Sequence, residues 1–158
     1  MKFLESVTQL CIGVWVGAMT GFAMTAPQLF STFGTERQRA GDLAGAMIWR
    51  INTVGMVLGA IALVALLPRL RQGLNRWRTA LLVAALALSL TGAFYIFPQL
   101  TQARPPRPIE QYAETDPVRV NYNAWHKRSE QVFGIAIILG AGVILLGPLG
   151  KGKGKEAN

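Results

Sequence analysis

The chain has 158 residues, of which 51% are hydrophobic and only 15% are charged, and its formal net charge is +8. Soluble domains carry about 25% charged residues, so this composition argues against one. The basic residues lie in loops beside long apolar runs, which favours anionic lipid headgroups over nucleic acid as their partner.

Four long segments contain no charged residue: residues 6–35, 51–68, 79–103 and 131–150. The hydrocarbon core of a bilayer requires about 20 apolar residues in a helix, so each segment is long enough to cross it. The sequence therefore predicts one all-α domain over residues 1–150, an integral membrane four-helix bundle. Its spans are expected near residues 4–28, 46–67, 77–99 and 125–147.

The first predicted helix has glycines at intervals of four residues, Gly13, Gly17 and Gly21. A face without side chains lets another helix backbone approach closely. We interpret this stripe as a helix-packing surface.

The second predicted helix begins before the membrane, because Thr35 and Gln38 resemble a capping box. Small residues also recur on this helix, at seven-residue intervals or next to them: Gly45, Asn52, Gly55 and Gly59. Seven residues are nearly two helical turns, so these positions share a face. We expect the first two helices to pack as a tight hairpin.

The third predicted helix is rich in Ala and Leu and leads into a Pro-rich loop, residues 101–116, expected on the non-cytoplasmic side. Asp116 can cap the next helix, with Pro117 at its first position. The fourth helix would then exceed the bilayer thickness, and a helical stub with Tyr122 and Asn123 would stand outside the membrane. Residues 151–158 are expected to form a flexible basic tail.

Two stretches of the chain read alike. Thr20-Gly21 is followed after five residues by Pro27-Gln28-Leu29, and Thr91-Gly92 is followed after five residues by Pro98-Gln99-Leu100. Both close an apolar run, so their ends would meet at one membrane surface. The similarity favours two helical hairpins arranged as a parallel repeat.

Four spans place both termini and the loop from residue 69 to residue 78 on one side. This loop carries no acid and four arginines, Arg69, Arg71, Arg76 and Arg78. Basic residues in short loops favour the cytoplasmic side, so both termini are expected in the cytoplasm.

Several polar residues fall in the predicted non-cytoplasmic half: Gln28, Arg50, Asn52, Tyr95, Gln99, His126 and Ser129. Polar side chains near hydrocarbon are costly unless paired, so they can face one another in a ligand-binding cluster. Asn52 is expected to form a hydrogen bond across a helix contact. In the alternative interpretation, Arg50 and His126 extend to the interface and the amides cap helix ends.

The chain offers little for catalysis. One histidine and one cysteine cannot supply the several ligands of a usual zinc or copper site. We predict no catalytic residue, no metal site and no cofactor. His126 could still serve as the single axial ligand of a haem or another tetrapyrrole.

Short motifs across all four spans carry a family resemblance: Trp15-Val16-Gly17-Ala18-Met19, Ala26-Pro27 with Leu29-Phe30, Ala40-Gly41 with Leu43-Ala44-Gly45, Arg50 and Asn52 with Gly55, Phe97-Pro98 with Leu100, and His126 with Ser129. From Leu10 to about Leu146, their order and spacing resemble the uncharacterised bacterial membrane family related to eukaryotic transmembrane protein 205-like proteins. The resemblance implies four spans, a place in the bacterial inner membrane and no established enzymatic activity. Where the family pattern has an Asn four residues after the Ser, this chain has Phe133.

Three functional hypotheses follow. The first is a non-catalytic accessory, assembly or scaffold subunit that packs against other membrane proteins or against itself, favoured by the glycine stripes. The second is a transporter or binder of small molecules or metal ions that uses the polar residues. The third is a haem-binding or redox membrane subunit, which depends on His126.

Overall fold

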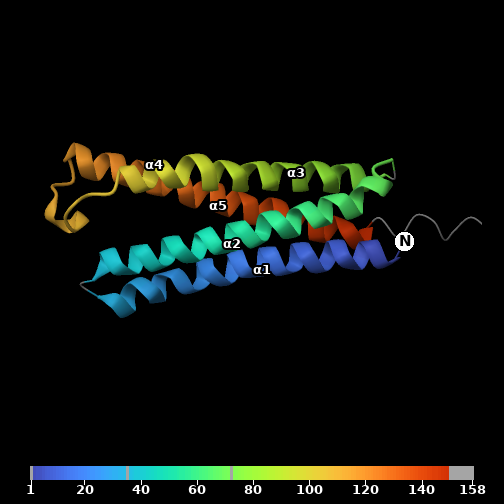
Figure 1. Ribbon diagram of the computed structural model, residues 1–158, viewed down its shortest axis with the longest axis horizontal. Helices are drawn as coiled ribbons and strands as arrows, with labels where there is room; N and C mark the ends of the chain where they lie inside the picture. The colour runs from blue at the N-terminus through green and yellow to red at the C-terminus, as the bar shows by residue number, and fades with distance from the viewer. Residues whose placement is uncertain (1, 35, 72, 150–158) are drawn as a thin grey trace, which may run out of the picture.

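The computed structural model describes residues 2–34, 36–71 and 73–149, and within them the fold consists of helices joined by turns and loops, without strands (Figure 1). The long helices are α1 (Lys2–Phe33), α2 (Arg37–Leu66), α3 (Asn75–Thr91) and α5 (Pro117–Leu149). A π-helical segment, η2 (Gly92–Ile96), joins α3 to α4 (Phe97–Gln102), and two 3₁₀ turns are η1 (Leu67–Arg69) and η3 (Ile109–Gln111). Thr35 of the expected capping box and the predicted tail, residues 151–158, lie outside the described residues.

Four helical stretches are long and apolar enough to cross a membrane: Lys2–Phe33, Gln38–Arg69, Asn75–Gln102 and Pro117–Pro148. This confirms the predicted all-α, four-helix membrane architecture. The stretches contain 28 to 32 residues. At about 1.5 Å per residue they measure roughly 42–48 Å, longer than the roughly 30 Å of a bilayer's hydrocarbon core. Part of the bundle therefore extends beyond the apolar layer.

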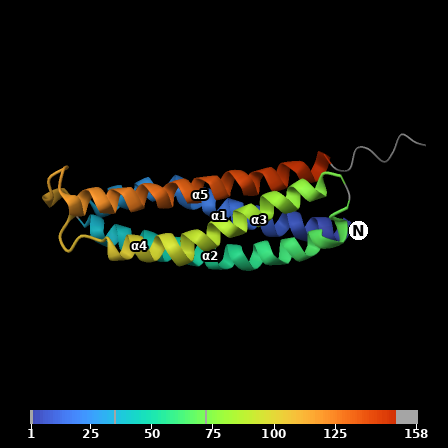
Figure 2. The same cartoon turned by 90° about the horizontal axis from the view of Figure 1, so that it is seen from above.

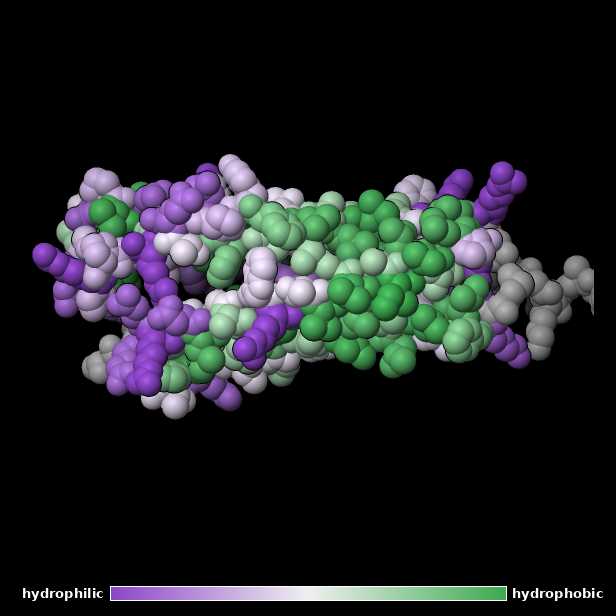
Figure 3. Space-filling model, viewed as in Figure 1, coloured by the Kyte–Doolittle hydropathy of each residue, from purple (hydrophilic) through white to green (hydrophobic). Residues whose placement is uncertain are grey.

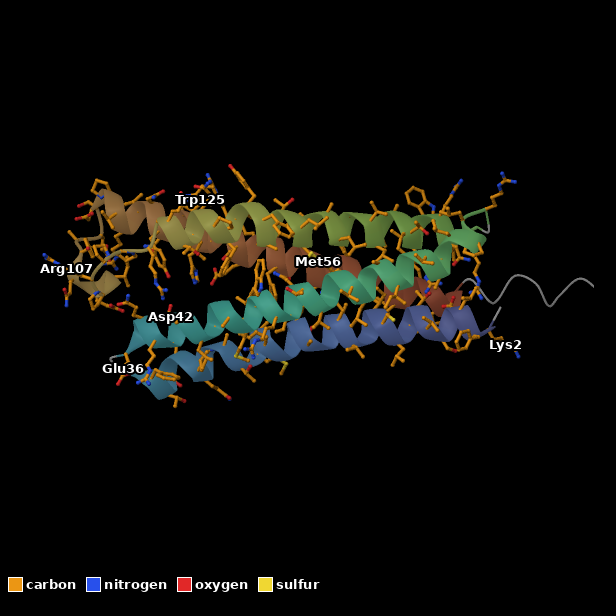
Figure 4. The ribbon with its side chains drawn as sticks, in the orientation of Figure 1. Lys2, Glu36, Asp42, Met56, Arg107 and Trp125 are labelled. Atoms are coloured by element: carbon orange, nitrogen blue, oxygen red, sulfur yellow. The ribbon has the colours of Figure 1, made fainter. Side chains whose placement is uncertain are left out.

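The face shown in Figure 3 divides into an apolar half and a hydrophilic half. On the face shown in Figure 3, hydrophobic side chains gather toward the end where the chain begins, and hydrophilic ones gather toward the opposite end. Glu36, Asp42 and Arg107 lie at that opposite end, whereas Lys2 lies at the other (Figure 4). The hydrophilic half contains the α1–α2 turn and the Pro-rich loop.

The helices form two antiparallel hairpins, α1 with α2 and α3 with α5, and α1 runs in the same direction as α3 (Figures 1 and 2). Contacts of α1 with α5 and of α2 with α3 join the hairpins. Both α1 and the α3–η2–α4 helix continue past their repeat prolines, Pro27 and Pro98. In η2 the bonding pattern widens, because the amide of Phe97 donates to the carbonyl of Gly92, five residues earlier.

The core lies between the four helices. Its fully buried members include Ile12, Leu66, Leu82 and Val143, one from each long helix, together with Trp15. Trp15 fits because α2 carries two glycines where the indole ring lies. A Cβ at Gly55 would overlap the ring, and a Cβ at Gly59 would approach the ring and overlap Leu86. Gly45, nearer the start of α2, also faces an aromatic ring, but a Cβ there would only touch Phe97, at 3.4 Å.

The glycines of α1 are placed differently. An added Cβ at Gly13, Gly17 or Gly21 would meet nothing within 4 Å. The α1–α2 hairpin therefore forms through the α2 glycines and Trp15. The packing expected at the α1 stripe has no counterpart among the described residues.

Helix α5 begins at an N-cap formed as predicted. The Oδ1 atom of Asp116 accepts a hydrogen bond of 2.8 Å from the amide of Val118, and Pro117 is the first helical residue. We expect Asp116→Ala to lower the free energy of unfolding by about 1 kcal/mol, because an orphan helix amide loses its acceptor. Denaturant titration of the detergent-solubilised protein would measure this loss. Asp116→Asn, which keeps an acceptor oxygen, should remain near wild type, and an equal loss in both variants would contradict the capping role.

Candidate functional site

A buried carboxylate lies at the end of the bundle where the chain begins. Glu5, in the first turn of α1, is only 6% exposed. Its Oε2 atom accepts a hydrogen bond of 2.9 Å from Nη1 of Arg69 and another of 3.0 Å from Nη1 of Arg78. Both arginines are also buried, Arg78 to 1% exposure. Three charged side chains are therefore buried together inside the bundle.

Arg78 fixes this carboxylate against two more helices. It extends from the beginning of α3, where its Nη1 also donates to the side-chain oxygen of Asn75. Its Nε donates to the main-chain carbonyl of Val143 on α5 at 3.1 Å. Arg69 arrives from η1, the turn that follows α2. The group therefore connects all four long helices.

Pro148 explains another contact of this group. A proline has no amide hydrogen, so the carbonyl four residues earlier, that of Ile144, lacks its normal helical donor. Nε2 of Gln9 donates to this carbonyl at 3.3 Å and to Oε1 of Glu5 at 3.2 Å. Gly147 makes this approach possible, since a Cβ there would overlap the amide of Gln9. We call Glu5, Gln9, Arg69, Asn75 and Arg78 the ion cluster.

The ion cluster carries one negative and two positive charges. Two of its buried donors, Nε of Arg69 and Nη2 of Arg78, have no hydrogen-bond partner in the described part of the chain. Burying charges costs several kcal/mol per ion, roughly, unless they are paired. Glu5 pairs with both arginines at once and leaves the cluster with one net positive charge. These bonds can hold the four helix ends in a fixed arrangement.

The ion cluster is not predictable from local sequence. The loop position of Arg69 and Arg78 predicts cations that face lipid headgroups, which is wrong because both bind Glu5 inside the bundle. Arg71 and Arg76 are exposed, as expected of a basic loop. Two features of the sequence could have indicated the cluster. Glu5 is a lone acid before a long uncharged run, and Pro148 leaves a carbonyl of the last helix without its normal donor.

The predicted polar residues do not converge at the opposite end of the apolar layer. Gln28 lines a hollow between α1 and α2 together with Thr25, Thr32 and Met47. Arg50 is exposed at the rim of a second hollow between the same helices. Asn52 is buried, but its amide has no hydrogen-bond partner among the described residues, in contrast to the bond expected across a helix contact.

The remaining members have local partners. The ring of Tyr95 meets that of Trp125 edge to face. His126 lies 3.4 Å from the carboxylate of Glu130 on its own helix and beside the ring of Tyr122. The hydroxyl of Ser129 donates to the carbonyl of His126. Gln99 is half-buried on α4.

A second link between the hairpins, also missed from sequence, lies in the hydrophilic half. Arg104, just after α4, pairs with Asp42 on α2 and donates to the carbonyl of Gln38. In the described ranges, no group of three or more His, Cys, Asp or Glu side chains could hold a metal ion.

A family profile described as a domain of unknown function, DUF4149, matches residues 10–108. The chain belongs to the DUF4149 family. No curated protein and no solved structure matches it.

The DUF4149 match covers most of α1, all of α2 to α4, and part of the Pro-rich loop. Arg69, Asn75 and Arg78 of the ion cluster fall inside it, whereas Glu5, Gln9 and the carbonyls of α5 fall outside. The family description gives no activity, so the functional argument rests on geometry.

Proposed function

We propose that this DUF4149 protein is a non-catalytic accessory, assembly or scaffold subunit of the membrane, and that the outer face of α1 packs against a transmembrane helix of another polypeptide. The observation that carries the proposal is the open space beyond Gly13, Gly17 and Gly21. Small residues at four-residue intervals are typical of helix contacts within membranes, where close backbone approach supplies the attraction.

Other helical glycines of this chain supply the contrast. An added Cβ would overlap Trp15 at Gly55, Val16 at Gly140 and Gln9 at Gly147, so at these three positions the missing side chain makes room for a neighbour. The α1 glycines lie in an apolar helix and have no such neighbour in the described residues. A helix supplied by a second polypeptide would fill the same role.

The same proposal includes location and origin. We place the protein in a bacterial inner membrane with both termini in the cytoplasm, and we relate its family to eukaryotic transmembrane protein 205-like proteins. Arg71 and Arg76, exposed in the short turn between the hairpins, support this orientation. Accessibility of Lys153 to a membrane-impermeant label from the non-cytoplasmic side would refute it.

Photo-crosslinking tests the α1 face. A photoreactive amino acid at Leu10, which is 68% exposed beside the glycine stripe, should give one discrete crosslinked product in native membranes. The same group at Ile138, 70% exposed on α5, should label mainly lipid. The mass of the product distinguishes another subunit from a second copy of the chain.

A bulky side chain on the stripe should abolish this product. In Gly17→Leu the crosslink from position 10 should be lost, because the leucine holds the partner helix away. Ala84→Leu, which places the same side chain at an exposed position of α3, should keep it. Loss in both variants, or in neither, would remove the basis for this interface.

The other two hypotheses have less support in the geometry. Transport needs polar side chains that face a common path, and Gln28, Arg50 and Tyr95 face different surroundings. Haem ligation depends on His126, which pairs with Glu130.

A further inference from the structure

A crevice opens on the outer surface between α1 and α2. It has a volume of about 210 Å³, with Val14, Ala18, Val54 and Leu58 along its apolar walls. Trp15 and Gly55 also line it, and Arg50 lies at one end. Val14 and Val54 are more than half exposed, so the crevice faces the surroundings of the bundle and not its core.

Arg50 brings a positive charge to the crevice. It is exposed, and in the part of the chain that the structure describes its guanidinium forms no ion pair or hydrogen bond. Arg69, Arg78, Arg104 and Arg119, in contrast, each pair with a carboxylate. The guanidinium of Arg50 is therefore free to bind an anion from outside the chain, and its planar donors suit a phosphate.

The crevice descends from this cation into the apolar layer. Residues 51–68 carry no charge, so Arg50 marks the boundary of the apolar stretch of α2. Leu58 lies eight residues further along the helix, which corresponds to about 12 Å. Charge at the boundary and an apolar groove below it reproduce the layout of a phospholipid, with headgroup phosphate above and acyl chain beneath.

Trp15 contributes only apolar surface to the crevice. Its Nε1 atom is buried against Gly55, without a hydrogen-bond partner among the described residues, and does not face the crevice. The binding surface below Arg50 is therefore apolar, as an acyl chain requires.

We propose that this crevice binds one anionic phospholipid of the surrounding bilayer, with its phosphate on Arg50 and one acyl chain between α1 and α2. The net charge of the headgroup supplies the preference over zwitterionic lipid, and the apolar walls supply the preference over free phosphate. No glycine of the α1 stripe lines the crevice, and both variants that test the lipid site change α2, so this test does not depend on the proposed subunit contact.

Native mass spectrometry of the purified full-length protein, mixed with phosphatidylglycerol or phosphatidylcholine in detergent, tests this site. The wild type should retain one phosphatidylglycerol about fivefold more strongly than Arg50→Gln does, the ratio expected from loss of one basic contact. Arg71→Gln removes an equal charge from the exposed loop at the other end and should bind as wild type does. Inorganic phosphate at millimolar concentration should not displace the lipid.

A second variant tests the acyl groove. Val54→Trp fills the crevice from its exposed wall and should abolish retention of the tightly bound lipid while the thermal unfolding temperature stays near that of the wild type. Equal retention of the two lipids by the wild type, unchanged retention in Arg50→Gln, or displacement by free phosphate would each overturn the proposal.

Discussion

Glu5→Ala should lower the free energy of unfolding by about 3–5 kcal/mol. The substitution removes the only carboxylate that contacts Arg69 and Arg78 in the described structure, and both guanidinium groups would remain buried without a counter-charge. Four helix ends would also lose the group that joins them. Denaturant titration in mild detergent, followed by far-ultraviolet circular dichroism, would measure the change.

Two further variants distinguish the cost of leaving buried arginines unpaired from the effect of removing any carboxylate. Glu114→Ala removes an exposed carboxylate that lies 3.9 Å from Arg119, and its unfolding should match the wild type. In the triple variant Glu5→Leu, Arg69→Leu, Arg78→Met, an apolar cluster replaces the charges, so this protein should be more stable than Glu5→Ala. A Glu5→Ala protein that unfolds like the wild type would show that the cluster does not hold the bundle together.

Trp15→Ala should produce a loss of similar size, about 3–5 kcal/mol. Trp15 is 2% exposed and fills the space that Gly55 and Gly59 leave on α2, so its removal opens a cavity between α1 and α2. Thermal unfolding of the same preparation would measure the loss.

Trp77→Ala is the matched control, because Trp77 is 58% exposed at the beginning of α3 and should contribute little to the core. The converse change, Gly55→Ala, places a methyl group against the indole ring and should destabilise by about 1–3 kcal/mol. Combining Gly55→Ala with Trp15→Phe should recover part of that loss. Additive losses in the double variant would argue against direct packing between these two positions.

The helical architecture could be predicted because it follows from local chemistry. Charge-free runs of at least 18 residues have few alternatives to a membrane helix, and Asp116 with Pro117 identified the first turn of α5. The likeness around Pro27 and Pro98 indicated helices that run in the same direction, and α1 and α3 do.

The ion cluster could not be predicted because its members are far apart in sequence. Glu5 and Arg78 are 73 residues apart, and only the packing of four helices brings them together. A run of arginines in a short loop is ordinarily solvated, so nothing local distinguishes Arg69 and Arg78 from Arg71 and Arg76. The sequence also could not show whether the glycine face of α1 points into the bundle or outward, because a stripe of small residues does not indicate which helix packs against it.

The ion cluster and the glycine stripe belong to one account. The cluster fixes the beginning of α1 against α3 and α5, and this arrangement leaves the face with Gly13, Gly17 and Gly21 turned outward. The described structure thus holds α1 from one side and leaves its other side open, where we propose that a partner helix packs.

The most direct test of this account is the mass of the complex extracted gently from native membranes, measured for the wild type and for Gly17→Leu. We expect the wild type to carry a second polypeptide in a fixed ratio, and Gly17→Leu to be folded but without it. A wild-type protein of single-chain mass, or a complex that survives Gly17→Leu intact, would contradict the proposed role of α1.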